Sequence, residues 1–302
     1  MASTTEIDNL NRRFAIPGIA EILAGENSLP KIKITGSAAS AEIYLHGAQI
    51  TSWHPVDSSE VIFLSEHSHW QDGKAIRGGI PICFPWFRAK SDNAAAPSHG
   101  VVRTKTWELE AVSEKGEAVI VTLSTESDAE SRKWWPYDFR LTHKITVDKA
   151  LIMELTTSNT GSEGFKIEEA LHTYNRVSDV KQVSITGLDK TSFLDNRDGN
   201  DLKVQQGDIA LTRDTDNAYI NTGAPVEIAD PVLQRRIRLE KQNSATTIIW
   251  NPWKDDAAKL ADLGDDEWTQ FACVEASNIL SAAVTVAPGQ KHTMTAIIKV
   301  TS

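Results

Sequence analysis

Long apolar runs are absent from the 302 residues, and cysteine and methionine are scarce. The most apolar stretch near the N-terminus, 14–23, is interrupted by proline, glycine and glutamate, so we expect neither a signal peptide nor a transmembrane helix. Cys83 and Cys273 are too few for a disulfide framework, and both stand in apolar segments that predict small buried side chains. These absences favour a cytoplasmic protein without membrane contact.

Positive charge is also in deficit, with 31 Lys and Arg against 41 Asp and Glu and a net charge of -10. Such a protein repels nucleic acid and anionic membranes, although a few local arginines would still suffice for a small anion. Glycine-rich phosphate loops, serine nucleophile elbows and zinc-spaced Cys/His clusters are missing, so we expect no cofactor and no metal. His67 and His69 favour a solvated loop over a metal site, and His143 has the apolar neighbours of a core histidine.

Alternation of apolar and polar residues is the main periodic signal, seen most clearly over 139–147. The predicted strands are 41–45, 60–64, 119–123, 139–147, 151–155, 182–186, 232–239, 245–250, 282–286 and 294–300. Helical signals are weak and fall at 19–24 and in a short segment that begins at Asp255. Many short strands without long helices predict an all-β antiparallel sandwich. We expect an N-terminal extension, 1–30, packed on one sandwich domain, 31–302.

Two segments are rich in glycine, proline and aromatic residues: 77–87, and the Trp-Asn-Pro-Trp sequence at 250–253. Proline excludes them from central strands and so predicts loops. Nine tryptophans are many for this length, and an exposed indole can stack on the apolar face of a sugar, although a single tryptophan is more commonly a core residue. After Arg77, the pair Gly78–Gly79 is expected to let the backbone approach a ligand closely.

Two residues are candidates for proton transfer. Strand parity over 165–174 puts His172 on a polar face that either lines a cleft or meets solvent. Glu275 shares a strand face with Phe271 and Cys273, and a carboxylate on an apolar face is costly unless it is paired. Such burial raises a carboxyl pKa, which suits an acid or base, but an internal salt bridge explains the residue equally well.

Six short segments, taken together, resemble a known family. In chain order they are Gly47–Trp53, Ile76–Pro81, His99–Arg103, Leu171–Tyr174, Trp250–Trp253 and Val274–Glu275. This series resembles the glucose-6-phosphate 1-epimerase (hexose-6-phosphate mutarotase) branch of the aldose 1-epimerase family, over roughly residues 40 to 300. The resemblance implies a galactose-mutarotase-like antiparallel β-supersandwich with few short helices. It also implies an enzyme that interconverts the α and β anomers of a hexose 6-phosphate.

The resemblance further implies which residues form the site. His172 and Glu275 would be catalytic. Substrate contacts would come from Arg77, Ser98, His99, Arg103, Asp216 and Trp250. The family often has glutamine where this chain has Ser98, and the shorter hydroxyl cannot make the same contact.

The chemistry accounts for these residue types. Anomer exchange opens the hemiacetal, so a base takes the O1 proton while an acid protonates the ring oxygen. Glu275 is the expected base, His172 the expected acid, and Arg77 and Arg103 the forked donors to a phosphate. A glycoside-cleaving enzyme would instead need a second carboxylate, for example Glu168, and a carbohydrate-binding module would need no acid–base pair. We expect a monomer or weak oligomer whose partner is a small sugar phosphate.

Overall fold

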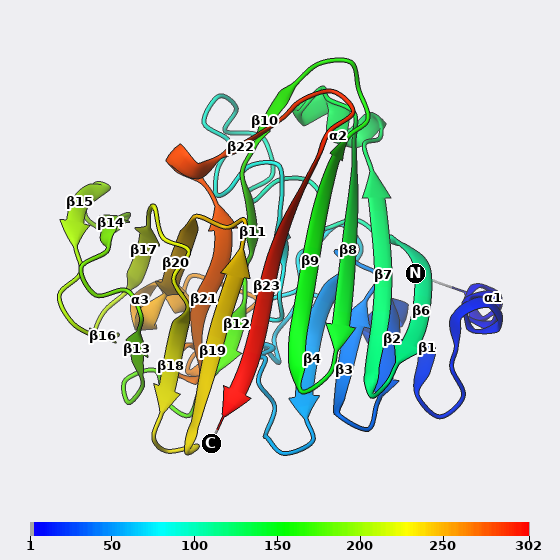
Figure 1. Ribbon diagram of the computed structural model, residues 1–302, viewed down its shortest axis with the longest axis horizontal. Coiled ribbons are helices and arrows are strands. Elements are labelled where there is room, and N and C mark those ends of the chain that lie inside the picture. The colour runs from blue at the N-terminus through cyan, green and yellow to red at the C-terminus, as the bar shows by residue number, and fades with distance from the viewer. Residues whose placement is uncertain (1–2, 302) are drawn as a thin grey trace.

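Strands dominate the computed structural model, which describes residues 3–301 (Figure 1). In that range the α-helices are α1 (Thr4–Phe14), α2 (Ala129–Trp134) and α3 (Trp253–Ala257). Three further turns are 3₁₀-helical: η1 (Glu26–Ser28), η2 (Glu267–Gln270) and η3 (Leu280–Ala282). The all-β prediction with few short helices is confirmed. No helix within 3–301 is long and apolar enough to cross a membrane.

One long antiparallel sheet has nine strands and runs across the front of Figure 1. Its spatial order is β16 (Ile209–Ala210), β13 (Ser184–Thr186), β18 (Val226–Asp230), β19 (Arg235–Gln242), β23 (Lys291–Thr301), β9 (Ala150–Asn159), β8 (Phe139–Val147), β7 (Ala118–Glu126) and β6 (Glu108–Lys115). Strand β8 has the predicted bounds, 139–147, and buries the apolar half of its alternating residues.

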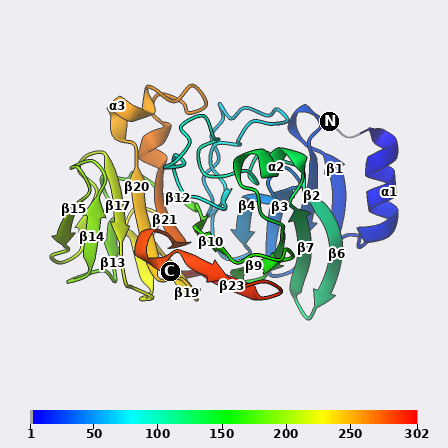
Figure 2. The same ribbon diagram turned by 90° about the horizontal axis from the view of Figure 1, so that it is seen from above.

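Two further sheets lie behind the two halves of this long sheet (Figures 1 and 2). The four-stranded sheet has the order β1 (Ala20–Ala24), β2 (Pro30–Thr35), β3 (Ala39–Tyr44) and β4 (Gln49–Pro55). The eight-stranded sheet has the order β15 (Asp201–Val204), β14 (Ser192–Asp195), β17 (Thr215–Tyr219), β20 (Thr246–Asn251), β21 (Phe271–Asn278), β11 (Glu169–Leu171) and β5 (Ile82–Cys83), with β12 (Tyr174–Arg176) also paired to β21. A two-stranded sheet joins β10 (Phe165–Ile167) to β22 (Val284–Val286).

One continuous apolar core fills the space between these layers. It contains Trp53 of the four-stranded sheet, Met153 and Ile298 of the long sheet, and Phe271 of the eight-stranded sheet. Side chains buried this completely each contribute roughly 1.5–3 kcal/mol relative to exposure. The core therefore fixes the eight-stranded sheet, and with it strand β21, against the long sheet.

The N-terminal segment differs from the expectation at two points. The segment 19–24, predicted as a helix, contains strand β1 (Ala20–Ala24), which pairs antiparallel with β2 and buries Ala20 and Ile22 on alternate positions. The helix lies earlier, at α1, where Asn11 donates to the carbonyl of Ile22 and accepts from its N–H. Asn11 thus satisfies backbone groups of an edge strand as a neighbouring strand would. The four-stranded sheet begins at Ala20, inside the segment 1–30.

Other predicted segments shift for local reasons. Residues 60–64 make isolated bridges instead of a strand, and the strand expected at 232–239 begins only at Arg235, after a turn. The segment 165–174 is the important correction, because it breaks into β10, β11 and β12. His172 lies in the break between β11 and β12, so it belongs to no continuous strand face. It is buried, which excludes the solvent alternative and leaves the cleft wall.

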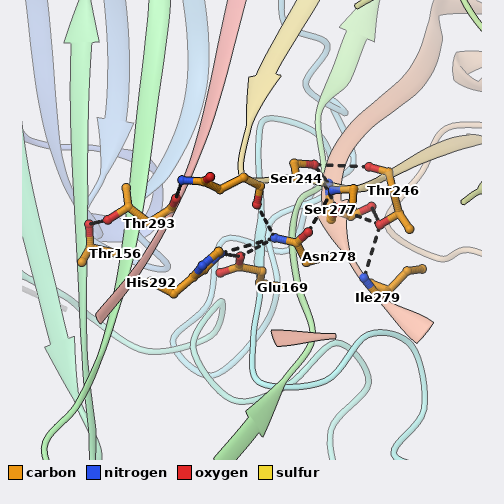
Figure 3. Close-up of polar contacts among 11 residues, drawn as sticks. Thr156, Glu169, Ser244, Thr246, Ser277, Asn278, Ile279, His292 and Thr293 are labelled. Carbon is orange, nitrogen blue, oxygen red and sulfur yellow. Dashed lines mark hydrogen bonds and ion pairs between the residues drawn. The ribbon is translucent and has the colours of Figure 1, made fainter. Parts of the chain in front are cut away.

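A buried polar cluster connects the eight-stranded sheet to the long sheet (Figure 3). Glu169 of β11 is fully buried, and its Oε1 accepts from Asn278 of β21 at 2.9 Å and from the ring of His292 of β23 at 2.8 Å. The Glu169 hydrogen bond is the main reason that the pKa of His292 is raised above its ordinary value. Because Glu169 pairs with Asn278 near the start of β11, this cluster holds the strands on which His172 and Glu275 depend.

Candidate active site

A small cavity of about 150 Å³ opens over strands β20 and β21. Seven of the eight residues that the family resemblance implies line it: Arg77, His99, Arg103, His172, Asp216, Trp250 and Glu275. The exception is Ser98, whose side chain is exposed and does not line the cavity. Residues from distant parts of the chain therefore converge on one cavity.

His172 and Glu275 face each other in this cavity. The Nε2 atom of His172 lies 3.4 Å from Oε1 of Glu275, and the two side chains are 10% and 0% exposed. Strands β11 and β12 both pair with β21, so the break that carries His172 is held beside Glu275. The backbone N–H of His172 is fixed by a 2.9 Å hydrogen bond to the carbonyl of Pro81.

Burial dominates the electrostatics of this pair. It raises the pKa of Glu275 well above its ordinary value, with a further contribution from the Asp216 carboxylate. Burial, followed by the charges of Arg103 and Arg77, lowers the pKa of His172 to about 3. Both shifts favour the uncharged forms, a protonated carboxyl and a neutral imidazole. Neither carboxyl oxygen of Glu275 has a hydrogen-bond partner among the described residues. The alternative of an internal salt bridge is therefore met only by the 3.4 Å contact with His172, without a hydrogen bond.

Aromatic rings form one wall of the cavity. Tyr174 stacks on the ring of His172 with a centroid distance of 4.9 Å and an interplanar angle of 19°. Trp250 meets His172 edge-on at 5.6 Å, and unlike Trp53 and Trp107 it is only partly buried. Most tryptophans are thus core residues, while Trp250 lines the cavity with a partly exposed indole.

Arg77 is held tightly by its own protein partners. Its Nε donates to Asp262 at 3.1 Å and its NH1 donates to the Tyr174 hydroxyl at 3.0 Å. The backbone of Arg77 exchanges two hydrogen bonds with the Ser68 hydroxyl. Asp262, which the sequence did not indicate, balances the guanidinium charge. Ser68 stands between His67 and His69, both of which are exposed.

Arg103 differs from Arg77 because no carboxylate lies within 4.0 Å of its guanidinium among residues 3–301. Its NH2 donates to the backbone carbonyl of Ser98 at 3.0 Å. Ser98 therefore contributes a main-chain acceptor that orients Arg103, whereas the sequence predicted a side-chain contact with substrate. The cavity is left with one cation whose charge is not balanced by a neighbouring carboxylate.

Arg88, which the sequence analysis missed, lines the cavity beside Asp216. Its guanidinium forms an ion pair with one oxygen of Asp216, while Asn196 donates to the other oxygen at 2.6 Å. The backbone N–H of Arg88 also donates to Nδ1 of His99 at 3.2 Å. Because Nδ1 accepts, the neutral ring of His99 carries its proton on Nε2.

Gly78, Gly79 and Glu168, which the sequence placed near a ligand, all lie outside the lining of this cavity. Gly78 and Gly79 do not line the cavity; instead a Cβ on Gly78 would lie 2.6 Å from the Phe63 carbonyl and one on Gly79 would lie 2.5 Å from the Ile50 carbonyl. The glycines are needed for close packing of protein backbone, not of a ligand. Glu168 accepts from the backbone N–H groups of Phe87 and Leu280 and does not line this cavity.

The fold and the site together define a class of protein. A β-supersandwich carries a buried histidine and carboxylic acid at a small cavity, next to an indole and three arginines. These are the groups that an enzyme needs to transfer protons on a small, polar and anionic molecule.

Comparisons with known proteins agree with this class. The sequence model of the aldose 1-epimerase family matches residues 30–299, and the chain belongs to that family. A Salmonella typhimurium protein named "Putative glucose-6-phosphate 1-epimerase" is 32% identical over 272 residues, which are 88% of this chain and 90% of that protein.

Solved structures agree as well. The crystal structure of the "putative mutarotase (YeaD)" from Salmonella typhimurium superposes with a TM-score of 0.89 and 29% identity, over 96% of each chain. A galactose mutarotase-like protein from Lactobacillus casei has a TM-score of 0.72 at 17% identity, covering 90% of this chain and 100% of that one. The latter likeness shows the fold alone, and it confirms the predicted galactose-mutarotase-like sandwich.

Proposed function

We propose that this protein interconverts the α and β anomers of a hexose 6-phosphate, with glucose 6-phosphate as the first candidate. The observation that carries the proposal is the 3.4 Å approach of His172 and Glu275 inside a cavity that also contains the unbalanced Arg103. The Salmonella typhimurium relative bears the name of that activity. Because the chain belongs to the aldose 1-epimerase family, it is an isomerase. The preference for a phosphorylated sugar is what we propose in addition.

The pair of His172 and Glu275 suits a reaction in which the sugar gains one proton and loses another. Ring opening requires that O1 loses its proton while the ring oxygen gains one, and closure on the other carbonyl face reverses both transfers. His172 and Glu275 hold one proton between them, whether as the uncharged pair or as imidazolium and carboxylate. We assign Glu275 as the base at O1 and His172 as the acid at the ring oxygen. This assignment requires the charged arrangement when substrate is bound.

Substrate binding favours that arrangement. The charges of Arg103 and Arg77 lower the pKa of His172, and a phosphate dianion beside Arg103 would offset them. Expulsion of water by the sugar favours the uncharged pair, as burial does, so the charge of the phosphate has to outweigh it. In this proposal the phosphate has two effects. It holds the substrate at Arg103, and its charge raises the pKa of His172, so that His172 can carry the proton it donates.

Phosphate recognition rests chiefly on Arg103. A guanidinium without a carboxylate partner keeps its forked donors and its charge available for an anion. Arg77 has Asp262 and Tyr174 as partners, so it contributes less net charge and more of the cavity's shape. Trp250 would cover an apolar face of the pyranose ring, and Asp216 would accept from sugar hydroxyls.

Two other functions are disfavoured by specific contacts. A glycoside-cleaving enzyme with Glu168 as the second carboxylate lacks support, because Glu168 already accepts two backbone N–H groups outside the cavity. A binding module has no use for a carboxyl whose two oxygens are buried without partners, since that arrangement costs free energy. We also propose the cytosol as the compartment, in line with two buried cysteines that are both free.

Anomeric exchange measured by NMR tests the proposal directly. The protein should speed exchange between the anomeric protons of glucose 6-phosphate far above the spontaneous rate, with glucose and galactose as comparison substrates. Hydrolysis of a glycoside without such exchange would replace the mutarotase with a glycosidase. Saturable binding of glucose 6-phosphate without exchange would instead support a binding module.

A further inference from the structure

Three ligand-type side chains meet beside the cavity floor. A ring nitrogen of His172, the Sγ of Cys273 and a carboxyl oxygen of Glu275 all lie within 4.8 Å of one another. All three residues are buried. Within residues 3–301 this is the group of histidine, cysteine and acidic side chains with the spacing of metal ligands, and His67 and His69 do not belong to it.

The sheet fixes the positions of this group. Cys273 and Glu275 are two residues apart on β21, so their side chains leave the same face of the strand. His172 reaches that face from the break between β11 and β12, and both of those strands pair with β21. The three ligand atoms are therefore held by paired backbone on either side, not by a mobile loop.

Several polar atoms in this group have no protein partner. Both carboxyl oxygens of Glu275 and Nδ1 of His172 are buried and make no hydrogen bond among the described residues. Burial of a polar atom without a partner costs free energy. The ring nitrogen that faces Glu275 is Nε2 of His172, and a cation bound there would satisfy the carboxyl oxygens of Glu275. This gives the group an affinity that an ordinary hydrogen-bonded cluster lacks.

We propose that His172, Cys273 and Glu275 bind a thiophilic divalent cation, with Zn²⁺ as the best match, and that the ion reversibly inhibits the enzyme. One nitrogen, one sulfur and one oxygen are ligands that zinc accepts, and three protein ligands leave a fourth position for water. At zinc bond lengths of about 2.0–2.3 Å, tetrahedral ligands lie roughly 3.3–3.7 Å apart. The 3.4 Å separation of Nε2 of His172 and Oε1 of Glu275 already falls in that range, and any pair nearer the 4.8 Å limit has to move closer when the metal binds. The fourth position faces the cavity, because His172 and Glu275 both line it.

The charges are compatible with a dication. The thiol of Cys273 and the carboxyl of Glu275 each release a proton to solvent when the metal binds, and the two resulting negative charges balance the ion. Arg77 and Arg88 are already paired with Asp262 and Asp216. Arg103 thus remains as the main opposing charge, and it weakens the site without abolishing it.

Inhibition follows from the ligands themselves, and this part rests on the proposed function. A metal ion that takes His172 and Glu275 removes the acid and the base together. The ion and a sugar would also compete for the same cavity, so substrate should protect the enzyme from the metal. The site therefore makes a metal-independent mutarotase sensitive to thiophilic cations.

Cobalt(II) gives a test that needs no sugar. A Co²⁺–thiolate bond produces a charge-transfer band in the near ultraviolet, so the protein should develop this band at one equivalent of metal and lose it when Zn²⁺ is added. Cys273→Ala should abolish the band. Cys83→Ala is the matched control, because Cys83 is also buried and free but lies outside the group, and this variant should keep the band.

Inhibition is the second measurement. Micromolar Zn²⁺ should slow anomer exchange in the wild type, a chelator should restore the rate, and Cys273→Ala should require at least about 10-fold more Zn²⁺ relative to its own metal-free rate. Absence of a thiolate band in the wild type, or a band that survives Cys273→Ala, overturns the proposal. If Cys273→Ala does not fold, Glu275→Gln takes its place with the band as readout, and an unchanged cobalt affinity overturns the proposal. A protein without anomer exchange that still shows the band would defeat the proposed function alone.

Discussion

The Nε2 atom of His172 lies 3.4 Å from Oε1 of Glu275, although the two residues belong to different strand segments and neither carboxyl oxygen has a hydrogen-bond partner. This separation is close enough for strong electrostatic coupling, and both side chains line the same cavity. The two residues therefore form one titrating unit, in which a change at either position alters the protonation of the other.

The first prediction concerns this unit. His172→Asn and Glu275→Gln should each lower kcat for anomer exchange by about 10²–10⁴-fold, because each removes a general acid or base while keeping a polar side chain of similar size. NMR exchange rates on glucose 6-phosphate measure the loss, and circular dichroism checks the fold. A folded variant that keeps more than half the wild-type rate would exclude that residue from the mechanism.

The second prediction separates the two arginines. Arg103→Ala should reduce kcat/KM for glucose 6-phosphate by about 10- to 100-fold and leave the rate on glucose nearly unchanged, because charge-assisted hydrogen bonds are worth about 1.5–3 kcal/mol. Arg77→Ala should reduce the rates on both sugars, since it also releases Tyr174 and Asp262. Arg103→Lys is the control, because it keeps the positive charge but loses the forked pair of N–H donors. Its kcat/KM for glucose 6-phosphate should lie between the values of the wild type and Arg103→Ala. Equal losses on both sugars for Arg103→Ala would leave the phosphate preference without a structural cause.

The third prediction follows from the correction at Ser98. Its side chain is exposed and only its backbone carbonyl touches Arg103, so Ser98→Ala should change kcat/KM by less than about twofold. The same steady-state assay on glucose 6-phosphate measures it. A loss of 10-fold or more would mean that the hydroxyl contacts substrate after all, as the family resemblance implied.

Local patterns predicted the fold better than they predicted individual strands. The alternation over 139–147 matches β8, because every second residue of this strand is buried and its pairing with β7 and β9 has no interruption. The segment 19–24 is too short for its sequence pattern to distinguish a helix from a strand. It forms strand β1 because it pairs with β2, a contact that the local sequence does not show. The segment 165–174 looks like one strand, but β10 pairs with β22 whereas β11 pairs with β21, so the segment breaks between β10 and β11. A second break, at His172, separates β11 from β12, although both pair with β21.

The site shows a similar limit. Motifs pointed to His172, Glu275 and four other lining residues, Arg77, His99, Arg103 and Trp250, since those residues stand in short recognisable segments. Asp216 stands in none of these segments and came only from the family resemblance. Arg88 and Asp262 were missed because their partners, Asp216 and Arg77, are 128 and 185 residues away. No local pattern encodes such pairings. The roles of the two catalytic residues and of the substrate-binding residues stay predictions until the variants are measured.

The fourth prediction concerns the cluster that links the sheets. Glu169→Gln should destabilise the protein by about 3 kcal/mol, because it removes one member of a largely buried ion pair and leaves His292 without its partner. The folded pKa of His292 is raised, so this pair stabilises fully below the ordinary histidine pKa and is lost as pH rises through the folded value. Urea unfolding at two pH values should therefore show a larger effect of Glu169→Gln at pH 5 than at pH 9. An equal loss of stability at pH 5 and pH 9 would mean that Glu169→Gln disturbs only the packing.

The last prediction has the opposite sign. His143 is fully buried among apolar residues; its Nδ1 donates to the carbonyl of Ala48 at 3.3 Å, and Nε2 has no partner among the described residues. Burial lowers its pKa from 6.5 to about 4, so the unfolded chain takes up a proton at a higher pH than the folded protein does.

Stability associated with His143 is present above pH 6.5 and falls as pH drops from 6.5 toward 4. The loss approaches about 3 kcal/mol at pH 4, at about 1.4 kcal/mol for each pKa unit. His143→Gln cannot titrate, so its free energy of unfolding should change less between pH 7 and pH 4 than that of the wild type, by roughly that amount. Urea midpoints of both proteins at the two pH values measure this difference. His54→Gln is the control, because His54 is an exposed histidine on β4 and this variant should leave the wild-type pH dependence intact. An identical pH dependence for His143→Gln and the wild type would mean that His143 is charged or solvated in the folded protein, contrary to its burial.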